Sequence, residues 1–139
     1  MDEWTLCSKI GKPECEKVLQ AHWDSFVQLS DFQRIADAGF NAIRIPVGYW
    51  SFLDIEWEYA CGAAPYLDKA IDWARETGLK IIIDLHGAPK SQNGFDHSGH
   101  KLAWPQWGDG DSIPNTHKVL KILEEKYANQ WMQDVVIAI

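Results

Sequence analysis

The sequence predicts an α/β protein with a parallel sheet, because a helical pattern precedes a short apolar run three times along the chain. The runs at 79–85 and 135–139 are mostly apolar, which is typical of strands buried on both faces of a parallel sheet. Right-handed crossovers join such strands, and ligands bind beyond their carboxyl ends. The residues that directly follow each predicted strand are therefore the candidates for function.

The first helix and strand are predicted within residues 30–46. Ser30 and Gln33 have the spacing of a capping box, so a helix is expected to begin there and to end at Gly39. The run 40–46 predicts a strand, which Pro46 is expected to stop.

The second and third units follow the same order. The helix of the second unit is expected to end near Gly78, and the strand 79–85 comes directly after it. A polar loop from 87 to 112 leads to the third helix and then to the strand 135–139. Helical spacing marks apolar positions Leu67, Ala70, Ile71 and Ala74 in the second helix, and Val119, Ile122, Leu123 and Tyr127 in the third.

Composition limits the kinds of partner. Acidic residues outnumber basic ones by 20 to 13, giving a net charge of -7, and no basic cluster opposes this balance, so nucleic-acid binding is not expected. No apolar run approaches the roughly 20 residues of a membrane helix, so membrane insertion is not expected either. The first residues are polar and acidic, and we expect no signal peptide in this chain.

Tryptophan and cysteine leave two questions open. Eight tryptophans are unusual in 139 residues, and they predict either a tryptophan-rich core or a cleft with aromatic walls that stack on sugars or bases. Cys7, Cys15 and Cys61 lack metal-ligand spacing and allow one disulfide or none.

Arg44, Asp84 and His86 are the first candidate site residues. Arg44 lies within a predicted strand, where it either holds a functional carboxylate in its ionised form or makes a structural ion pair with a neighbour such as Asp84. The alternation of strand side chains places Asp84 and His86 on one face. They are either a polar pair at the mouth of a site, or His86 is a core histidine whose hydrogen bonds are satisfied within the protein.

The loop after the second strand offers two further interpretations. His97 and His100 are the residues that would complete a metal site with His86, but their glycine-containing loop does not fix their positions, so this alternative ranks last. The segment 91–96 is rich in hydrogen-bonding side chains and is either an ordinary turn or a binding loop.

Five segments of the chain together carry a resemblance to a known family: Asp2–Trp4, Arg44–Trp50, Ile83–Pro89, Ser91–Asp96 and Asp134–Ile137. They resemble, in the same order, segments of fungal exo-β-1,3-glucanases (glucan 1,3-beta-glucosidases) of glycoside hydrolase family 5. The resemblance implies a TIM barrel and retaining hydrolysis of β-1,3-glucan in polysaccharide catabolism or cell-wall organisation, with no cofactor and a secreted or cell-wall location.

The resemblance also implies that residues 1–139 are a fragment of a single catalytic domain, an α/β partial (β/α)8 barrel with about strands 2–4 and their helices. Its first strand is expected before Asp2, and both catalytic glutamates of the retaining mechanism are expected beyond Ile139. The fragment alone is therefore expected to be inactive. The alternatives are a non-catalytic β-glucan-binding remnant and a fragment of a family 5 cellulase-like endoglucanase.

Four residues receive roles from the resemblance. Arg44 matches the arginine that supports the nucleophile carboxylate, and His86 matches the histidine that lines the subsite of the cleaved sugar. Phe95 matches an aromatic residue that stacks on the next glucose, and Asp96 is a weaker binding candidate beside it. The chain departs from the family pattern at Lys90, where glycine is expected, and at His97, where asparagine is usual.

Overall fold

A computed structural model describes residues 1–56 and 58–139, so Trp57 lies outside the described residues. Two 3-10 helices, η1 (Tyr49–Ser51) and η2 (Asp96–Ser98), follow β1 and β2. The helices and strands, in chain order, are α1 (Glu3–Ile10), α2 (Lys12–Ser25), α3 (Leu29–Asp37), β1 (Ala42–Gly48), α4 (Ala64–Thr77), β2 (Lys80–Gly87), α5 (Ser112–Tyr127) and β3 (Val136–Ala138).

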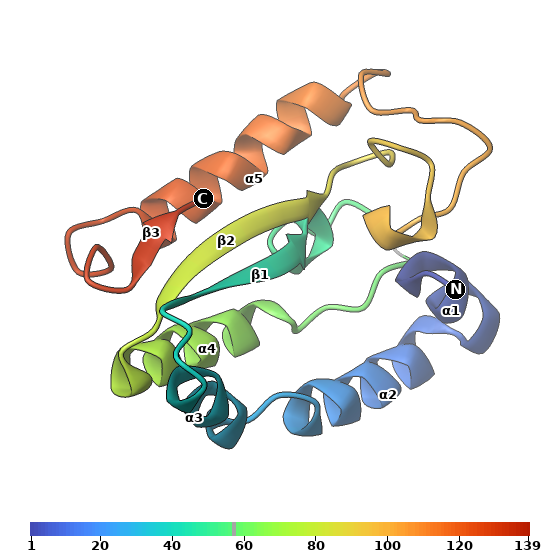
Figure 1. The fold of residues 1–139 in the computed structure, drawn as a ribbon. Helices are drawn as coiled ribbons and strands as arrows, with labels where there is room; N and C mark the ends of the chain where they lie inside the picture. The colour runs from blue at the N-terminus through green and yellow to red at the C-terminus, as the bar shows by residue number, and fades with distance from the viewer. Residues whose placement is uncertain (57) are drawn as a thin grey trace.

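The three strands form one parallel sheet in the order β1-β2-β3, which confirms the predicted α/β class. Ile81 in β2 lies opposite Ile43 on one side and Val136 on the other. In Figure 1, β1 and β2 run side by side, and both point toward the loop after β2 and toward α1. Helices α3 and α4 lie along one side of the pair in this view, and α5 lies along the other side, next to β3.

The core lies between the sheet and helices α4 and α5. The predicted apolar positions of α4 (Leu67, Ala70, Ile71 and Ala74) are all buried, and Val119, Leu123 and Tyr127 of α5 are buried in the same cluster. Helix α4 ends before Gly78, whose φ of 75° is the left-handed conformation that favours glycine after a helix. The periodic pattern therefore predicted these buried positions correctly, except for Ile122 of α5, which is only partly buried.

Helix α3 differs from the prediction at its first residue. Its capping box is formed by Gln28 and Asp31, and the Asp31 carboxylate accepts the backbone N–H of Gln28 at 2.9 Å. Ser30 therefore lies inside the helix. The helix begins before Ser30 because Gln28 and Asp31 together satisfy free N–H groups at its start. The predicted end of the helix is also wrong by one residue. Ala38 is the C-cap, and Gly39, with φ of 86°, follows it.

Pro46 does not stop its strand. Strand β1 continues to Gly48, and Pro46 lies opposite Asp84 of β2. Within the described sheet β1 is an edge strand, where a proline's missing N–H does not interrupt a ladder between two neighbours.

Helices α1 and α2 were not predicted. Asp2 caps α1 by accepting the backbone N–H of Thr5 at 2.7 Å, and Pro13 stands in the first turn of α2, where its missing N–H costs no helical bond. Cys7 and Cys15 form a buried disulfide between the two helices, and Cys61 is exposed and unpaired. The sequence had left one disulfide or none open, and the structure shows one.

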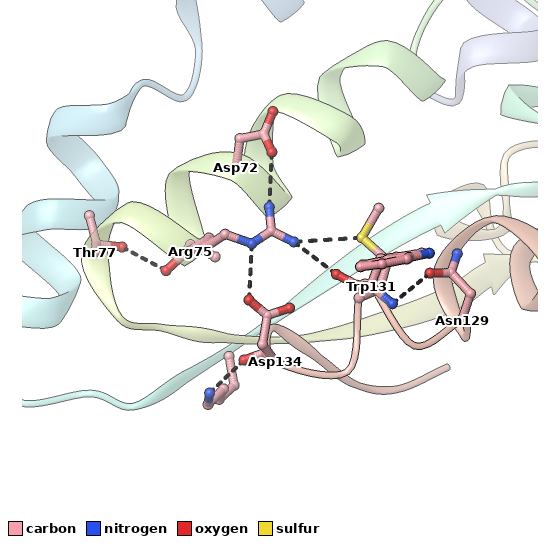
Figure 2. Close-up of polar contacts among 9 residues, drawn as sticks. Asp72, Arg75, Thr77, Asn129, Trp131 and Asp134 are labelled. Carbon is pink, nitrogen blue, oxygen red and sulfur yellow. Dashed lines mark hydrogen bonds and ion pairs between the residues drawn. The ribbon is translucent and has the colours of Figure 1, made fainter.

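Arg75 of α4 fixes the segment that leads into β3 (Figure 2). Its Nε lies 3.0 Å from Oδ2 of Asp134, and its Nη1 lies 3.1 Å from Oδ1 of Asp72 on its own helix. A hydrogen bond from this guanidinium lowers the pKa of the Asp134 carboxyl. The contact thereby holds β3 against the helix that precedes β2.

Within the described residues, the structure contains no helix whose length and apolar character would let it cross a membrane.

Candidate functional site

Arg44 of β1 meets Asp84 and His86, which lie in the second half of β2. Nη2 of Arg44 lies 2.8 Å from Oδ2 of Asp84, and Nδ1 of His86 lies 2.9 Å from the same oxygen. Asp84 and His86 lie on one face of β2, as the period of the strand predicted. The structure shows the ion pair of Arg44 with Asp84, and the role of Arg44 in holding a functional carboxylate stays a prediction.

The exposure of these side chains leaves the cluster open to a ligand. The Arg44 side chain is 54% exposed and that of His86 is 36% exposed, whereas Asp84, between them, is 27% exposed. A paired carboxylate beneath two half-exposed donors is typical of a polar site and not of a closed core pair.

The loop after β2 brings His97 to this cluster. His97 Nδ1 lies 3.3 Å from Nε2 of His86, and its other ring nitrogen, Nε2, lies 3.3 Å from Nδ2 of Asn93. The Phe95 ring stacks beside the His97 ring, with centroids 5.8 Å apart. The departure from the family pattern at position 97 therefore contacts a predicted site residue directly.

Hydrogen bonds from side chains hold this loop in place. The Gln92 amide accepts the backbone N–H of Ala88 at 3.0 Å and donates to the carbonyl of His86. The buried hydroxyls of Ser91 and Ser98 are hydrogen bonded to each other, and Ser98 also donates to the Phe95 carbonyl at 2.7 Å. The short loop between β2 and η2 is thus fixed at both ends.

Lys90 has a positive φ, a backbone conformation that glycine adopts easily and that is strained for lysine. Its φ is 62°, in the left-handed region that disfavours residues with a Cβ. Its ammonium group lies 3.2 Å from the carbonyl of Asp109 and 3.8 Å from the Asp111 carboxylate, across the loop. These contacts compensate in part for the strained backbone.

Phe95 and Asp96 lie on the outer side of the loop. The Phe95 side chain is 61% exposed, as expected of a residue that stacks on a sugar. The Asp96 carboxylate is 55% exposed and lies 3.6 Å from the amino group of Met1. The structure does not bring either side chain into contact with Arg44 or Asp84.

One of the three histidines of the possible metal site, His100, has a different partner. The His100 ring stacks on the Trp4 indole, with centroids 3.9 Å apart and an interplanar angle of 15°. Among residues 1–56 and 58–139, no cluster of three or more histidine, cysteine or acidic side chains has the arrangement of metal ligands. His86 and His97 are instead joined to each other.

Trp50 is a structural residue of the site that the sequence analysis did not single out. Its ring lies where Cβ atoms at Gly48, Gly87 and Gly99 would stand, all within 2.8 Å of ring atoms. Glu3 contacts this tryptophan and also accepts the backbone N–H of Ala60 at 3.1 Å, and burial raises the pKa of its carboxyl. The sequence signal for a large side chain packed here was the presence of glycines at the ends of both strands and in the following loop.

Two exposed tryptophans lie on the same loop and were also missed. Trp104 is 64% exposed, and Leu102 N–H donates to the Gly94 carbonyl at 3.0 Å, which joins its segment to that of Phe95. Trp107 is 46% exposed, and its indole N–H donates to Thr116 at 3.0 Å. Of the two predictions for the tryptophans, the structure shows the core, on which Trp50 and Trp73 pack, whereas the exposed Trp104 and Trp107 leave a cleft with aromatic walls as a prediction.

A separate cavity lies beside β1. Its volume is about 540 Å³, and mainly apolar side chains of β1 and helices α2, α3 and α4 line it. It borders Arg44 but neither Asp84 nor His86. It therefore lies beside the cluster and is not the space between the cluster and the loop.

Comparison with known proteins decides the family. The family described as "Cellulase (glycosyl hydrolase family 5)" matches residues 7–139. The chain belongs to glycosyl hydrolase family 5. It is 49% identical over 140 residues to "Probable glucan 1,3-beta-glucosidase A" of Aspergillus niger, with 100% of this chain and 33% of that protein covered.

Two further comparisons agree with this assignment. "Glucan 1,3-beta-glucosidase 2" of Candida albicans is 48% identical over 130 residues, which are 91% of this chain and 27% of that protein. The crystal structure of rutinosidase from Aspergillus niger superposes with a TM-score of 0.89 at 24% identity, over 99% of this chain and 39% of that chain. This second likeness shows the fold alone, a partial (β/α)8 barrel. The chain spans about a third of the length of the curated relatives it matches.

Proposed function

We propose that residues 1–139 form the substrate-holding part of a secreted or cell-wall glycosidase that hydrolyses β-1,3-glucan with retention of configuration. The observation that supports this most strongly is the 49% identity over the whole chain to a probable glucan 1,3-beta-glucosidase. The open Arg44, Asp84 and His86 cluster beside exposed Phe95 is the arrangement such a substrate needs, with polar groups for hydroxyls and an aromatic face for a pyranose ring.

Each residue of the cluster has a distinct role in this proposal. The Arg44 guanidinium uses Nη2 for Asp84 and remains half exposed, so it can also hold a second carboxylate, that of the nucleophile. His86 lines the subsite of the cleaved sugar, and Phe95 stacks on the next glucose. Asp96 is the weaker binding residue at the outer side of the loop.

Asp84 is an unsuitable catalytic acid or nucleophile. A single oxygen of its carboxylate contacts both Arg44 and His86 and is thereby occupied. Retaining hydrolysis needs two free carboxyl groups about 5 Å apart. We infer that both glutamates come from outside residues 1–139 and that these residues alone are inactive.

The location is supported by the disulfide. The Cys7–Cys15 bond forms and persists mainly in oxidising compartments, which include the exterior of the cell.

The test is hydrolysis by the complete product of the gene that encodes these residues. We expect glucose release from laminarin, with little from soluble cellulose derivatives, and proton NMR is expected to show the β-anomer of glucose first. Faster hydrolysis of cellulose would favour the endoglucanase alternative. Quenching of tryptophan fluorescence by laminarin without hydrolysis would favour the binding alternative.

A matched pair of variants tests the site. Phe95→Ala removes an aromatic face at 61% exposure and is expected to raise KM for laminarin about 5-fold. Phe40→Ala removes an equally exposed phenylalanine, at 64%, before β1 and is expected to leave KM unchanged. Equal effects of the two would contradict the assignment of Phe95. Hydrolysis by purified residues 1–139 would contradict the proposed origin of the glutamates.

A further inference from the structure

The side chains around His97 form a continuous chain of hydrogen bonds from the backbone of Phe95 to Asp84. The Phe95 N–H lies 2.9 Å from Oδ1 of Asn93, and Nδ2 of Asn93 lies 3.3 Å from Nε2 of His97. On the other side of the His97 ring, Nδ1 lies 3.3 Å from Nε2 of His86. Nδ1 of His86 then lies 2.9 Å from Asp84.

The two ends of the chain fix the direction of every bond in it. A backbone N–H only donates, so the oxygen of Asn93 faces Phe95 and its NH2 group faces His97. At the other end, a carboxylate oxygen that also contacts Arg44 only accepts, so His86 carries a proton on Nδ1.

The protons of the two imidazoles follow from these ends. His97 Nε2 accepts from Asn93, so His97 donates from Nδ1 to Nε2 of His86. Each ring then donates one bond and accepts one, and each is neutral. No other distribution of protons gives every bond in the chain one donor and one acceptor.

We propose that His97 is a positioning residue that, together with Asn93, holds His86 as a neutral imidazole with its proton on Nδ1 and its lone pair on Nε2. Resting on the proposed function, this means that both ring nitrogens of His86 are occupied, Nδ1 by Asp84 and Nε2 by His97, so His86 meets the sugar through the face and edge of its ring and through no free N–H or lone pair. The Phe95 ring beside His97 restrains the same ring from the outer side.

An added proton would break this arrangement. A proton on either imidazole places two N–H groups face to face, at the His86–His97 contact or at the His97–Asn93 contact. The charged groups around the two histidines are paired with groups of opposite charge. Arg44 pairs with Asp84 on the strands, and Asp96 pairs with the Met1 amino group on the outer side of the loop. His100 is stacked on Trp4. The bond directions, and not a local excess of charge, therefore set the preference for the neutral pair.

The direct test is nitrogen-15 NMR of the histidine rings in the complete gene product, with His97→Asn used to assign the signals. Near pH 8 we expect both His86 and His97 to carry the proton on Nδ1. A proton on Nε2 of either ring would overturn the proposal. This readout needs no glucan hydrolysis, so it remains decisive even where the proposed function fails.

Substitution of Asn93 tests the cause. Asn93→Asp replaces the donor that faces His97 with an acceptor, so His97 is expected to hold protons on both nitrogens. The control Asn129→Asp adds the same charge beyond α5, where Asn129 caps the end of a different segment, and no change at His97 is expected. An unchanged His97 in Asn93→Asp would overturn the proposal.

Two variants at position 97 test whether the hydrogen bond from this residue to His86 fixes the protonation of His86. His97→Asn retains an amide donor for Nε2 of His86, so His86 is expected to keep its proton on Nδ1. His97→Ala removes the donor and frees Nε2, while Asp84 keeps a proton on Nδ1, so a fraction of His86 with protons on both nitrogens is expected to appear. These two do not depend on Asn93→Asp being folded, and an identical His86 signal in both would overturn the role assigned to His97.

Discussion

The sheet body and the loop after β2 are held together by different forces. Helices α4 and α5 pack on the sheet through a cluster of buried apolar side chains that includes Leu123 and Ile81, both fully buried. The loop from 88 to 111 is held instead by side-chain hydrogen bonds, such as those of Gln92 and the Ser91–Ser98 pair. The body supplies rigidity, and the loop supplies the polar and aromatic groups of the site.

This difference has a consequence for substitution. Apolar packing loses free energy in proportion to the volume removed, so the body is sensitive at many positions. A hydrogen-bonded loop is sensitive only where a buried partner is left unsatisfied or where the backbone is strained. The predictions below test this contrast by unfolding in urea, with the complete gene product.

The largest effect is expected in the body, at Leu123. Leu123→Ala leaves a cavity where the side chain is fully buried and is expected to cost about 2–5 kcal/mol. Leu120→Ala, on the exposed side of the same helix at 40% exposure, is expected to cost less than about 0.5 kcal/mol. Equal losses would contradict the placement of the core.

The α1–α2 pair is neither body nor loop, because a covalent bond joins its two helices. Replacement of both Cys7 and Cys15 by serine is expected to cost about 2.5 kcal/mol, since the bond closes a short loop in the unfolded chain. Cys61→Ser, which removes the exposed unpaired thiol, is the control and is expected to be neutral. A loss in the control but not in the double variant would contradict the pairing.

Asp2 joins α1 to the loop and makes their contact dependent on pH. Desolvation acts to raise the pKa of Asp2, but hydrogen bonds from Thr5 and from the Lys101 backbone outweigh it and lower the pKa below its ordinary value of 3.8. Because the folded state holds the ionised form more firmly, this contribution is present above pH 3.8 and is lost as pH falls through the lowered pKa.

Asp2→Asn is therefore expected to destabilise by about 1 kcal/mol at pH 7. The difference from the wild type is expected to shrink as the pH is lowered below 3.8. A difference that stays constant from pH 7 to pH 3 would show that the charge of Asp2 contributes nothing.

The smallest effect is expected at Lys90, and it separates backbone strain from side-chain contacts. Lys90→Gly and Lys90→Ala both lose the contacts of the ammonium group with the carbonyl of Asp109 and with Asp111. Only glycine relieves the positive φ of 62°, so the glycine variant is expected to be about 1 kcal/mol more stable than the alanine variant. An alanine variant of equal stability would contradict the strain.

The body was predictable from the sequence because its contacts follow a period. The positions Leu67, Ala70, Ile71 and Ala74 were predicted and are all buried, and the alternation along β2 placed Asp84 beside His86. The three errors in the first unit, at Ser30, Gly39 and Pro46, are local: a competing cap at Gln28, a C-cap one residue earlier at Ala38, and an edge position within the described sheet.

The loop and the N-terminal helices were not predictable in the same way. The Ser91–Ser98 bond and the His86–His97 contact join side chains that no helix or strand period relates. The buried residues of α1 and α2 are the two cysteines, so neither helix shows a broad apolar face. The residues of the site were found from the ends of the strands and from the resemblance, whereas Trp50 and its glycines required the structure.

The most direct test of the proposed site compares two histidines. His86 lies in the cluster with Asp84, and His100, from the same loop region, is stacked on Trp4. In the complete gene product we predict that His86→Ala lowers kcat/KM for laminarin on the order of 100-fold, whereas His100→Ala changes it by less than about 3-fold. Full activity in His86→Ala, or an equal loss in both variants, would contradict the assignment of the carboxyl ends of β1 and β2 as the glucan site.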